Sequence, residues 1–324
     1  MNSIYITDYI QSPDIEKEIL GDELTNKCSE SVKVLLVWHE VINKSYLSQF
    51  KQLTGIVRYG VGYDLIDLNL VREKGIIFCN TPDYGVDEVS DTAIAMIMNF
   101  QRGVSQYNEI ARSLDDETWQ ENRLQHIQRT SSIKLGIIGA GRIGASVIRK
   151  AEAIGFQTCF YDPFKDQGYE KSLGCNRVHT MEELVSESDI ISIHADLNDQ
   201  TRGMIDTNFL DLMKDGCILI NTARGEIFKD LDLLYHSLKE GKIYALGTDV
   251  LPVEPPNKSS LINAWRLDKS WLKGRLIINP HSAFYSQQAF VEMREKAAIN
   301  ALRILKGKEP FNIIASGNQD FGLK

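Results

Sequence analysis

Three side chains that could act together on a carbonyl group each follow a segment with the apolar pattern of a buried strand. Arg224 follows residues 217–221, Glu254 comes soon after residues 243–249, and His281 follows residues 275–279. Arginine can hold carboxylate and carbonyl oxygens with a forked set of donors. Histidine can protonate a forming alkoxide, and a neighbouring glutamate fixes the ring's orientation and favours its charged form. These residue types suit the reduction of a 2-oxo acid.

Each of these residues also has a plain structural interpretation. An arginine at a strand end is usually part of a surface ion pair, and a histidine after a proline can be structural with its hydrogen bonds satisfied. The three meet only if their strands are parallel, because the carboxyl ends of parallel strands converge on one edge of a sheet. His126, His179 and His236 are expected at the surface, since nothing around them suggests chemistry.

A glycine-rich turn between a strand and a helix is the element that must position this chemistry. An apolar run at residues 134–138 leads into Gly139, Gly141 and Gly144, and apolar residues recur at a helical period from Arg142. The first glycine permits the turn, the second lets a pyrophosphate approach, and the third lets helix and strand pack closely. The helix N-terminus offers N–H groups and partial positive charge to phosphates. The alternative is a plain α/β turn.

Asp162 follows a second expected strand, residues 156–161, at roughly the 20-residue spacing typical of dinucleotide-binding folds. A carboxylate in that place accepts hydrogen bonds from an adenosine ribose and repels a 2′-phosphate. The sequence therefore predicts NAD rather than NADP as the cofactor.

Composition bounds the class of protein. A chain of 324 residues is expected to form two domains. Its content of 43% hydrophobic and 25% charged residues is typical of a soluble globular protein. The net charge of −8 argues against nucleic acid or an anionic membrane as the partner. No apolar run reaches the roughly 18 residues of a membrane span. Five cysteines without a C-x-x-C pair indicate free thiols in a reducing cytoplasm, and the six histidines show no metal-ligand spacing.

The first hundred residues alternate strand and helix, which predicts a small doubly wound unit. One expected strand, residues 55–58, leads to Gly60 and Gly62 around Val61, where consecutive amides could form an anion nest. The alternative is an ordinary glycine turn. The polar segment 113–130 is interpreted as the crossing between domains. Beyond it, six strands with interleaved helices match the dinucleotide fold, and a long helix at 286–305 could return to the first domain.

Together these motifs resemble the NAD-dependent D-isomer-specific 2-hydroxyacid dehydrogenases, nearest the C-terminal-binding-protein branch. The matching pieces are the glycine loop and residues 57–64, 161–163, 221–225, 280–286 and 292–298. The resemblance implies an α/β fold of two doubly wound domains. A Rossmann NAD-binding domain, 106–285, is inserted into a discontinuous flavodoxin-like substrate domain, 1–105 and 286–324. The resemblance also implies that the protein is a homodimer.

The resemblance further implies the site residues. The catalytic set is Arg224, Glu254 and His281, with His281 as the proton donor. The NAD contacts are Val61, Ile138, Gly139, Gly141, Arg142, Ile143, Gly144, Asp162, His194, Ala195, Leu197, Thr222, Ala223, Asp249 and His281. The substrate contacts are Trp38, His39, Arg58, Gly60, Val61, Gly62, Arg224 and Phe284.

The chain departs from the family pattern in two informative places. Phe284 stands where the nearest branch tends to have tryptophan, so that branch's pocket preference need not transfer. The segment between Glu254 and His281 is longer than usual. Its basic and aromatic residues are Lys258, Arg266, Lys269, Lys273, Arg275, Trp265 and Trp271, against Asp268 as an acid. One hypothesis is that it recognises a second anionic group on the substrate, such as a phosphate or phosphonate. The alternative is a solvated loop whose tryptophans pack on a partner subunit.

Two functions follow from the resemblance. The first is an enzyme that interconverts a 2-oxo acid and its D-2-hydroxy acid. The second is an NAD(H)-responsive scaffold that keeps the fold and binds peptide partners. The intact catalytic set favours the enzyme, as does a chain that stops at Lys324 without the long tail of the animal corepressors.

Overall fold

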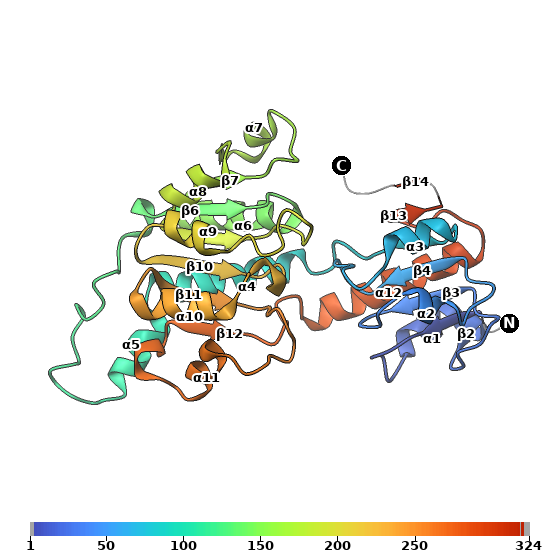
Figure 1. Ribbon diagram of the computed structural model, residues 1–324, viewed down its shortest axis with the longest axis horizontal. Helices are drawn as coiled ribbons and strands as arrows, with labels where there is room; N and C mark the ends of the chain where they lie inside the picture. Colours follow the sequence, from blue (N-terminus) through green and yellow to red (C-terminus); the bar gives the residue numbers. More distant parts are fainter. Residues whose placement is uncertain (1–2, 318, 321–324) are drawn as a thin grey trace. The chain divides into compact units, whose positions relative to one another are not determined.

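The computed structural model describes residues 3–317 and 319–320 and divides into two compact units. The first unit combines the residues up to Gly85 with those from Tyr285 onward, and the second runs from Val86 to Phe284 (Figure 1). The expected α/β fold with two doubly wound parts, one built from both chain ends, is confirmed.

The first boundary differs from the expected residue 105. Helix α4 (Val86–Gln101) belongs to the second unit because it packs on α6 and β10 and buries Ala93, Met96 and Phe100 there. The polar segment 113–130 likewise lies inside the second unit and is not the crossing. The second boundary falls at Tyr285, one residue before the expected 286.

The first unit is a seven-stranded sheet among the described residues, in the order β14-β13-β5-β4-β3-β1-β2. Its strands are β1 (Ile4–Ile6), β2 (Leu24–Thr25), β3 (Val34–Val37), β4 (Gly55–Arg58), β5 (Ile77–Cys79), β13 (Ile313–Ser316) and β14 (Gln319–Asp320). The first five are parallel, and β13 runs antiparallel to β5. Every residue of β3 is buried, as expected for a central strand covered on both faces.

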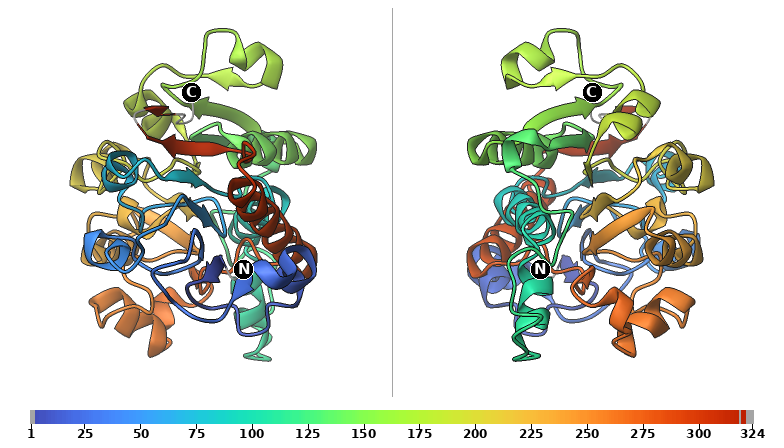
Figure 2. Two further views of the ribbon diagram at one scale, coloured as in Figure 1. Left: turned by 90° about the vertical axis from the view of Figure 1, so that its right-hand side faces the viewer. Right: turned by 90° about the vertical axis from the view of Figure 1, so that its left-hand side faces the viewer.

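Helices cover this sheet (Figure 2). They are α1 (Asp14–Leu20), η1 (Gly21–Glu23), α2 (Lys44–Leu47), α3 (Leu68–Glu73) and the long α12 (Gln287–Leu305). Helix α12 packs on β3, β4 and α1. A Cβ on Gly55 would lie only 2.6 Å from the Ile304 side chain, so the glycine at the start of β4 lets this helix approach the sheet.

The second unit is a parallel seven-stranded sheet in the order β12-β11-β10-β9-β6-β7-β8. Its strands are β6 (Lys134–Ile138), β7 (Gln157–Tyr161), β8 (Asn176–Arg177), β9 (Ile190–Ile193), β10 (Cys217–Asn221), β11 (Ile243–Thr248) and β12 (Leu276–Ile278). The short edge strand β8 makes one more than the six expected. The helices besides α4 are α5 (Val104–Ala111), η2 (Thr130–Ser132), α6 (Arg142–Ile154), α7 (Tyr169–Leu173), α8 (Met181–Glu187), α9 (Thr207–Leu212), η3 (Gly225–Ile227), α10 (Leu231–Glu240), α11 (Ser260–Arg266) and η4 (Ser270–Leu272).

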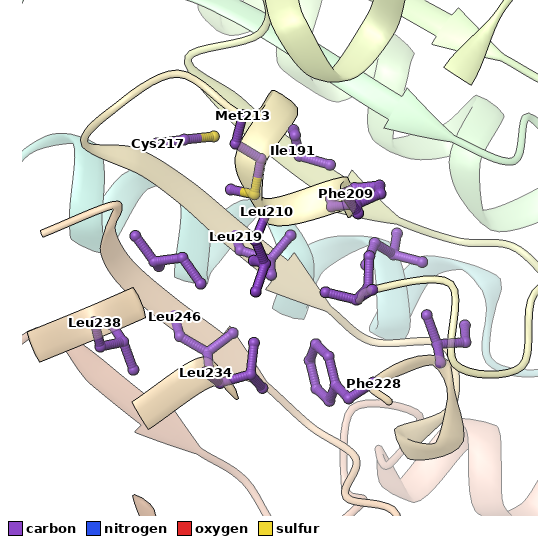
Figure 3. Close-up of a cluster of buried hydrophobic side chains, with 14 of the residues drawn as sticks. Ile191, Phe209, Leu210, Met213, Cys217, Leu219, Phe228, Leu234, Leu238 and Leu246 are labelled. Atoms are coloured by element: carbon purple, nitrogen blue, oxygen red, sulfur yellow. The ribbon is translucent and has the colours of Figure 1, made fainter. Parts of the chain in front are cut away.

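Two hydrophobic cores lie on the two faces of the second sheet. Leu219 belongs to one core, whereas its neighbours Ile218 and Ile220 belong to the other, because successive strand residues point to opposite faces. In the first core, Leu234 and Leu238 of α10 lie near Leu219 and Leu246 of the sheet (Figure 3). Strands buried on both faces hold their carboxyl ends rigidly, and those ends carry the candidate site.

All five cysteines carry free thiols, as predicted. Burial raises the pKa of Cys79 and Cys217 to about 12, so these two are unreactive core residues. Among the described residues, no helix is long and apolar enough to cross a membrane.

Candidate active site

The loops that carry Arg224, Glu254 and His281 leave neighbouring strands of the second unit. Strands β10, β11 and β12 are adjacent and parallel, with Asn221 level with Thr248, and Thr248 level with Ile278. The three following loops therefore start at the same edge of the sheet.

His281 and Glu254 form a direct pair at this edge. Nδ1 of His281 lies 2.7 Å from Oε2 of Glu254, and Oε1 of Glu254 accepts the Leu251 N–H at 2.8 Å. Burial raises the pKa of Glu254, but the bond and charge of His281, the Leu251 amide and the charge of Arg224 outweigh it and lower that pKa. Glu254 is therefore ionised at neutral pH. An ionised carboxylate only accepts, so Nδ1 carries a proton and Nε2 faces away from Glu254.

Asp249 fixes the backbone of the His281 loop. Its two carboxylate oxygens accept the N–H groups of Ser282 and Ala283 at 2.8 and 3.0 Å, and its carbonyl accepts the His281 N–H at 2.8 Å. His281 has a φ of +54°, which a residue other than glycine rarely adopts unless its surroundings impose it. Burial raises the pKa of Asp249, while the Ala283 and Ser282 amides oppose that shift. This positioning role adds to the NAD contact expected from sequence.

Arg224 is held against the Glu254 loop by its neighbours. A Cβ on Gly225 would lie 1.9 Å from the Leu251 carbonyl carbon, so the two loops meet backbone to backbone and only glycine fits. The Asn221 side chain shapes the turn by donating to the Arg224 carbonyl at 2.9 Å and accepting the Ala223 N–H at 3.0 Å. The charge of Arg224 contributes to the lowered pKa of Glu254. The structure thus brings the three predicted catalytic residues together.

The glycine loop fits a dinucleotide. Gly139 has a φ of +88°, and a Cβ on Gly144 would lie 2.0 Å from the Gly139 oxygen, whereas a Cβ on Gly141 meets nothing within 4 Å. Gly139 and Gly144 therefore serve the turn and its packing, and Gly141 leaves open space for a ligand. Helix α6 begins at Arg142 with no side-chain cap, as an anion-binding helix end requires.

Asp162 is 8% exposed and holds the glycine loop. Its Oδ2 accepts the Ala140 N–H at 2.9 Å and its Oδ1 accepts the Phe164 N–H at 3.0 Å. The sequence pattern predicted a carboxylate at the end of this strand but gave no sign of this link to Ala140.

Most other expected NAD contacts lie at or after the ends of β6, β9 and β10, which are adjacent in the sheet, whereas Val61 lies in the first unit. A Cβ on Gly139 would lie 2.8 Å from both the His194 carbonyl and the Ala195 nitrogen, so the segment after β9 lies directly against the glycine loop. His194 Nε2 lies 2.8 Å from Ser192 Oγ, and its Nδ1 lies 3.5 Å from Thr222 Oγ1. Burial lowers the pKa of His194 to about 3, which keeps its ring neutral.

His126 was expected at the surface, but it is only partly exposed and packs on its own unit. Its Nε2 lies 3.2 Å from the Phe100 carbonyl oxygen, and its ring centroid lies 3.8 Å from that of Tyr244. Burial accordingly lowers the pKa of His126. The segment 113–130 folds back onto its own unit, which its polar sequence did not indicate. His179 and His236 are exposed as expected.

The expected substrate residues of the first unit gather after β3 and β4. Trp38 and His39 follow β3, where Asp8 accepts both of their N–H groups at 3.0 and 2.5 Å. Arg58 ends β4.

The turn after β4 offers fewer amides than predicted. Gly60 was expected to offer its amide to an anion, but that N–H donates to Thr81 Oγ1 at 2.7 Å. Val61 and Gly62 remain as candidate amide donors, with the Val61 carbonyl held by Asn80 Nδ2 at 2.6 Å. Phe284, also expected at the substrate, is half-buried in the second unit.

The basic segment between Glu254 and His281 is partly structural. Arg275 donates to the carbonyls of Tyr244, Trp271, Leu238 and Ile243. Trp271 packs on Tyr235 of the same chain, with centroids 5.6 Å apart, and Lys273 pairs with Asp268 at 3.0 Å. Lys258 and Arg266 line a cavity of about 410 Å³ with Asn263 and Leu267.

Comparison with known proteins identifies the family to which the chain belongs. Residues 94–283 match the model of the D-isomer specific 2-hydroxyacid dehydrogenase NAD-binding domain. C-terminal-binding protein 1 of Caenorhabditis elegans is 30% identical over 306 residues, which are 92% of this chain and 41% of that protein. D-3-phosphoglycerate dehydrogenase of Methanocaldococcus jannaschii is 29% identical over 317 residues, 98% of this chain and 58% of that protein. The chain thus spans about half the length of these curated relatives.

Solved structures share the fold over nearly the whole chain. D-lactate dehydrogenase of Aquifex aeolicus, complexed with NAD and lactic acid, superposes with a TM-score of 0.82 at 28% identity, covering 94% of this chain and 96% of that one. Apo D-mandelate dehydrogenase of Rhodotorula graminis has a TM-score of 0.79 at 24% identity, covering 99% of each chain, and supports the fold alone.

Proposed function

The chain belongs to the D-isomer specific 2-hydroxyacid dehydrogenase family, and from this we propose that it interconverts a 2-oxo acid and the corresponding D-2-hydroxy acid. The observation that carries the proposal is the pair of His281 and ionised Glu254 beside Arg224. This group lies at the same sheet edge as the glycine loop.

NAD is the cofactor, and when bound it donates or accepts a hydride. The residues suited to hold it are Gly141 with its open approach, the uncapped start of α6, and Asp162 at the end of β7. His194 and Thr222, after β9 and β10, would complete its surroundings.

The chain's own residues supply the proton transfer and the positioning. His281 gives a proton from Nε2 to the forming alkoxide in reduction and takes it back in oxidation, while Glu254 holds the ring at Nδ1. Arg224 binds and polarises substrate oxygens with its fork of donors. In the first unit, the Val61 and Gly62 amides are the candidate donors to the substrate carboxylate. These groups act by placement and fixed charge.

A direct assay tests this function. The purified protein is mixed with NADH and a panel of 2-oxo acids, and loss of NADH absorbance is followed for wild type, His281→Ala and the exposed-site control His179→Ala. We expect turnover in wild type and control, and a fall in kcat of roughly 10²-fold or more in His281→Ala. Equal rates in His281→Ala and wild type would discard the proton-donor role.

A second candidate is an NAD(H)-responsive scaffold with little turnover. The 30% identity to C-terminal-binding protein 1 is the observation that favours it. Tight NADH binding without turnover of any 2-oxo acid would support the scaffold. The assembled His281–Glu254 pair favours the enzyme, because a scaffold has no use for an oriented proton donor.

We also propose a cytoplasmic homodimer. Exposed apolar side chains on α5 and in the segment that follows it, Val104, Leu114 and Trp119, support a subunit contact there. The free thiols fit a reducing compartment. Sedimentation velocity of wild type and Trp119→Ser tests the subunit contact, and a wild-type monomer would contradict it.

A further inference from the structure

Tyr9 is an exposed aromatic residue in an unusual backbone conformation. It lies just beyond the carboxyl end of β1, with 59% of its surface exposed and a φ of +66°. Bulky residues rarely adopt this left-handed conformation, and it persists only where the surroundings impose it.

The ring of Tyr9 forms the outer layer of an aromatic stack within the first unit. Its centroid lies 4.5 Å from that of Trp38 and 5.2 Å from that of His39. Trp38 is 5% exposed and lies 5.7 Å from both Tyr59 and Phe290. Tyr9 therefore rests on a buried and rigid aromatic base. We call the surface that Tyr9 and His39 form over this base the aromatic face.

Asp8 fixes this face to the sheet. Its Oδ1 accepts the Trp38 N–H at 3.0 Å and the Thr7 hydroxyl at 2.6 Å, and its Oδ2 accepts the His39 N–H at 2.5 Å. These bonds tie the end of β1 to the end of β3, which explains how the strained backbone of Tyr9 is maintained.

The aromatic face neighbours the candidate carboxylate donors of the same unit. Strands β1, β3 and β4 are adjacent and parallel, so Tyr9, Trp38 and the turn at Val61 and Gly62 follow strand ends at one edge. The Trp38 ring contacts Tyr59, which directly precedes that turn. Two strand spacings, about 10 Å, separate β1 from β4. An aryl group on the carbon next to the oxo carbon reaches across this distance, whereas a methyl group does not.

We propose that the aromatic face binds the side chain of the substrate, and that this substrate is a 2-oxo acid with a planar aryl side chain. Aromatic rings pair in stacked or tilted arrangements at the centroid distances that Tyr9 and Trp38 already show. The Asp8 carboxylate beside the face disfavours a second carboxylate or a phosphate at this place. The assignment rests on the proposed dehydrogenase function and names its substrate class.

Steady-state kinetics with NADH test the proposal. The kcat/KM of wild type is measured with phenylpyruvate, pyruvate and oxaloacetate, and the measurement is repeated for Tyr9→Ala, Tyr9→Phe and Phe311→Ala. Phe311 is a matched control, since it is 61% exposed in the same unit but lies after α12. We expect wild type to prefer phenylpyruvate, and Tyr9→Ala to lower the ratio of phenylpyruvate to pyruvate kcat/KM roughly tenfold or more. Tyr9→Phe and Phe311→Ala should keep the ratio.

The outcomes separate this assignment from the proposed function. Turnover of pyruvate or oxaloacetate without a preference for phenylpyruvate overturns the assignment and leaves the dehydrogenase standing. A Tyr9→Ala variant with an unchanged ratio also overturns it. No turnover of any 2-oxo acid by an NADH-binding protein overturns both. An equal loss on every substrate, with weaker NADH binding, would mean that Tyr9 supports only the fold.

Discussion

Nδ1 of His281 lies 2.7 Å from Oε2 of Glu254, although the two residues stand on loops that leave different strands. Each partner is held independently. Glu254 is fixed through the Leu251 N–H, and His281 through the Asp249 carbonyl and carboxylate. The ring therefore has a defined orientation before any substrate arrives, which is what a proton donor requires.

Glu254→Gln tests the charge of this pair. The amide keeps the size of the side chain but removes the carboxylate that accepts the Nδ1 proton of His281 and orients the ring. We expect kcat for reduction to fall roughly tenfold or more, with the Kd for NADH unchanged. Steady-state rates and NADH fluorescence titration measure the two quantities. A variant that loses NADH affinity but keeps kcat would contradict the assigned role.

Gly141→Ala and Gly144→Ala should separate ligand binding from folding. A methyl group on Gly141 meets no protein atom within 4 Å, so the stability of the fold is kept, and we expect the Kd for NADH to rise roughly tenfold. A methyl group on Gly144 would lie 2.0 Å from the Gly139 oxygen, and we expect a loss of about 2–3 kcal/mol in the free energy of unfolding. Urea unfolding and NADH titration of both variants check this, and the reverse pattern would refute it.

Asp162→Ala should weaken the preference for NADH over NADPH. The variant loses a negative charge near the expected ribose site, and Ala140 loses the acceptor for its N–H. The lost acceptor weakens the binding of both cofactors alike. The ratio of the kcat/KM values for NADH and NADPH therefore measures the effect of the lost charge alone. An unchanged ratio would show that Asp162 acts only on the loop.

Tyr59→Phe tests the support beneath the Val61 turn. The Tyr59 hydroxyl donates at 2.9 Å to Glu16, which is fully buried and also accepts from Arg294. Burial raises the pKa of Tyr59 well above its ordinary value, so the hydroxyl keeps the proton that it donates.

Removing that donor should lower the free energy of unfolding by about 1–2 kcal/mol. It should also raise KM for the 2-oxo acid more than it changes kcat. Tyr285→Phe, at an exposed position of the same unit, is the control. A changed stability with an unchanged KM would restrict Tyr59 to the fold.

The lowered pKa of His194 predicts that the folded protein loses stability in acid. Its pKa is about 3 in the folded chain, against about 6.5 when unfolded. Between these two pH values, His194 binds a proton in the unfolded chain but not in the folded chain. The contribution of the neutral, buried ring to the free energy of unfolding is therefore present above about pH 6.5 and declines as the pH falls toward 3. The decline approaches about 1.4 kcal/mol per pH unit between the two pKa values.

His194→Gln should therefore flatten the fall in unfolding free energy between pH 6.5 and 4. Urea titrations at several pH values measure it, with the exposed-site variant His236→Gln as control. Parallel curves for His194→Gln and wild type would contradict the prediction.

Much of the fold could be predicted because its central strands are short apolar runs. The bounds of β4, β6 and β10 match the sequence prediction at both ends. The packing of helix α1 could not be predicted in this way. In α1, the fully buried Glu16 is compensated by Arg294, which lies 278 positions away in the chain. A local sequence pattern cannot indicate an ion pair between residues so far apart in the chain.

The candidate site was predictable to the same degree. Strand-end position and residue type pointed to Arg224, Glu254 and His281, which the structure brings together. The residues that hold them were not visible in sequence, because an aspartate that accepts backbone N–H groups looks like any other aspartate. Asp249 acts in this way on the His281 loop, and Asp8 does the same for Trp38 and His39 in the first unit.

The first unit combines both ends of the chain, and this has a consequence during synthesis. Helix α12 covers β3 and β4 and packs against α1, yet 228 residues lie between Arg58 at the end of β4 and Gln287 at the start of α12. A ribosome working at roughly 5–20 residues per second makes the inserted unit in the meantime. We therefore expect the apolar side of β3 and β4 to stay uncovered by α12 for tens of seconds during synthesis. Crosslinking of stalled nascent chains that end before and after residue 305 would reveal when α12 begins to cover these strands.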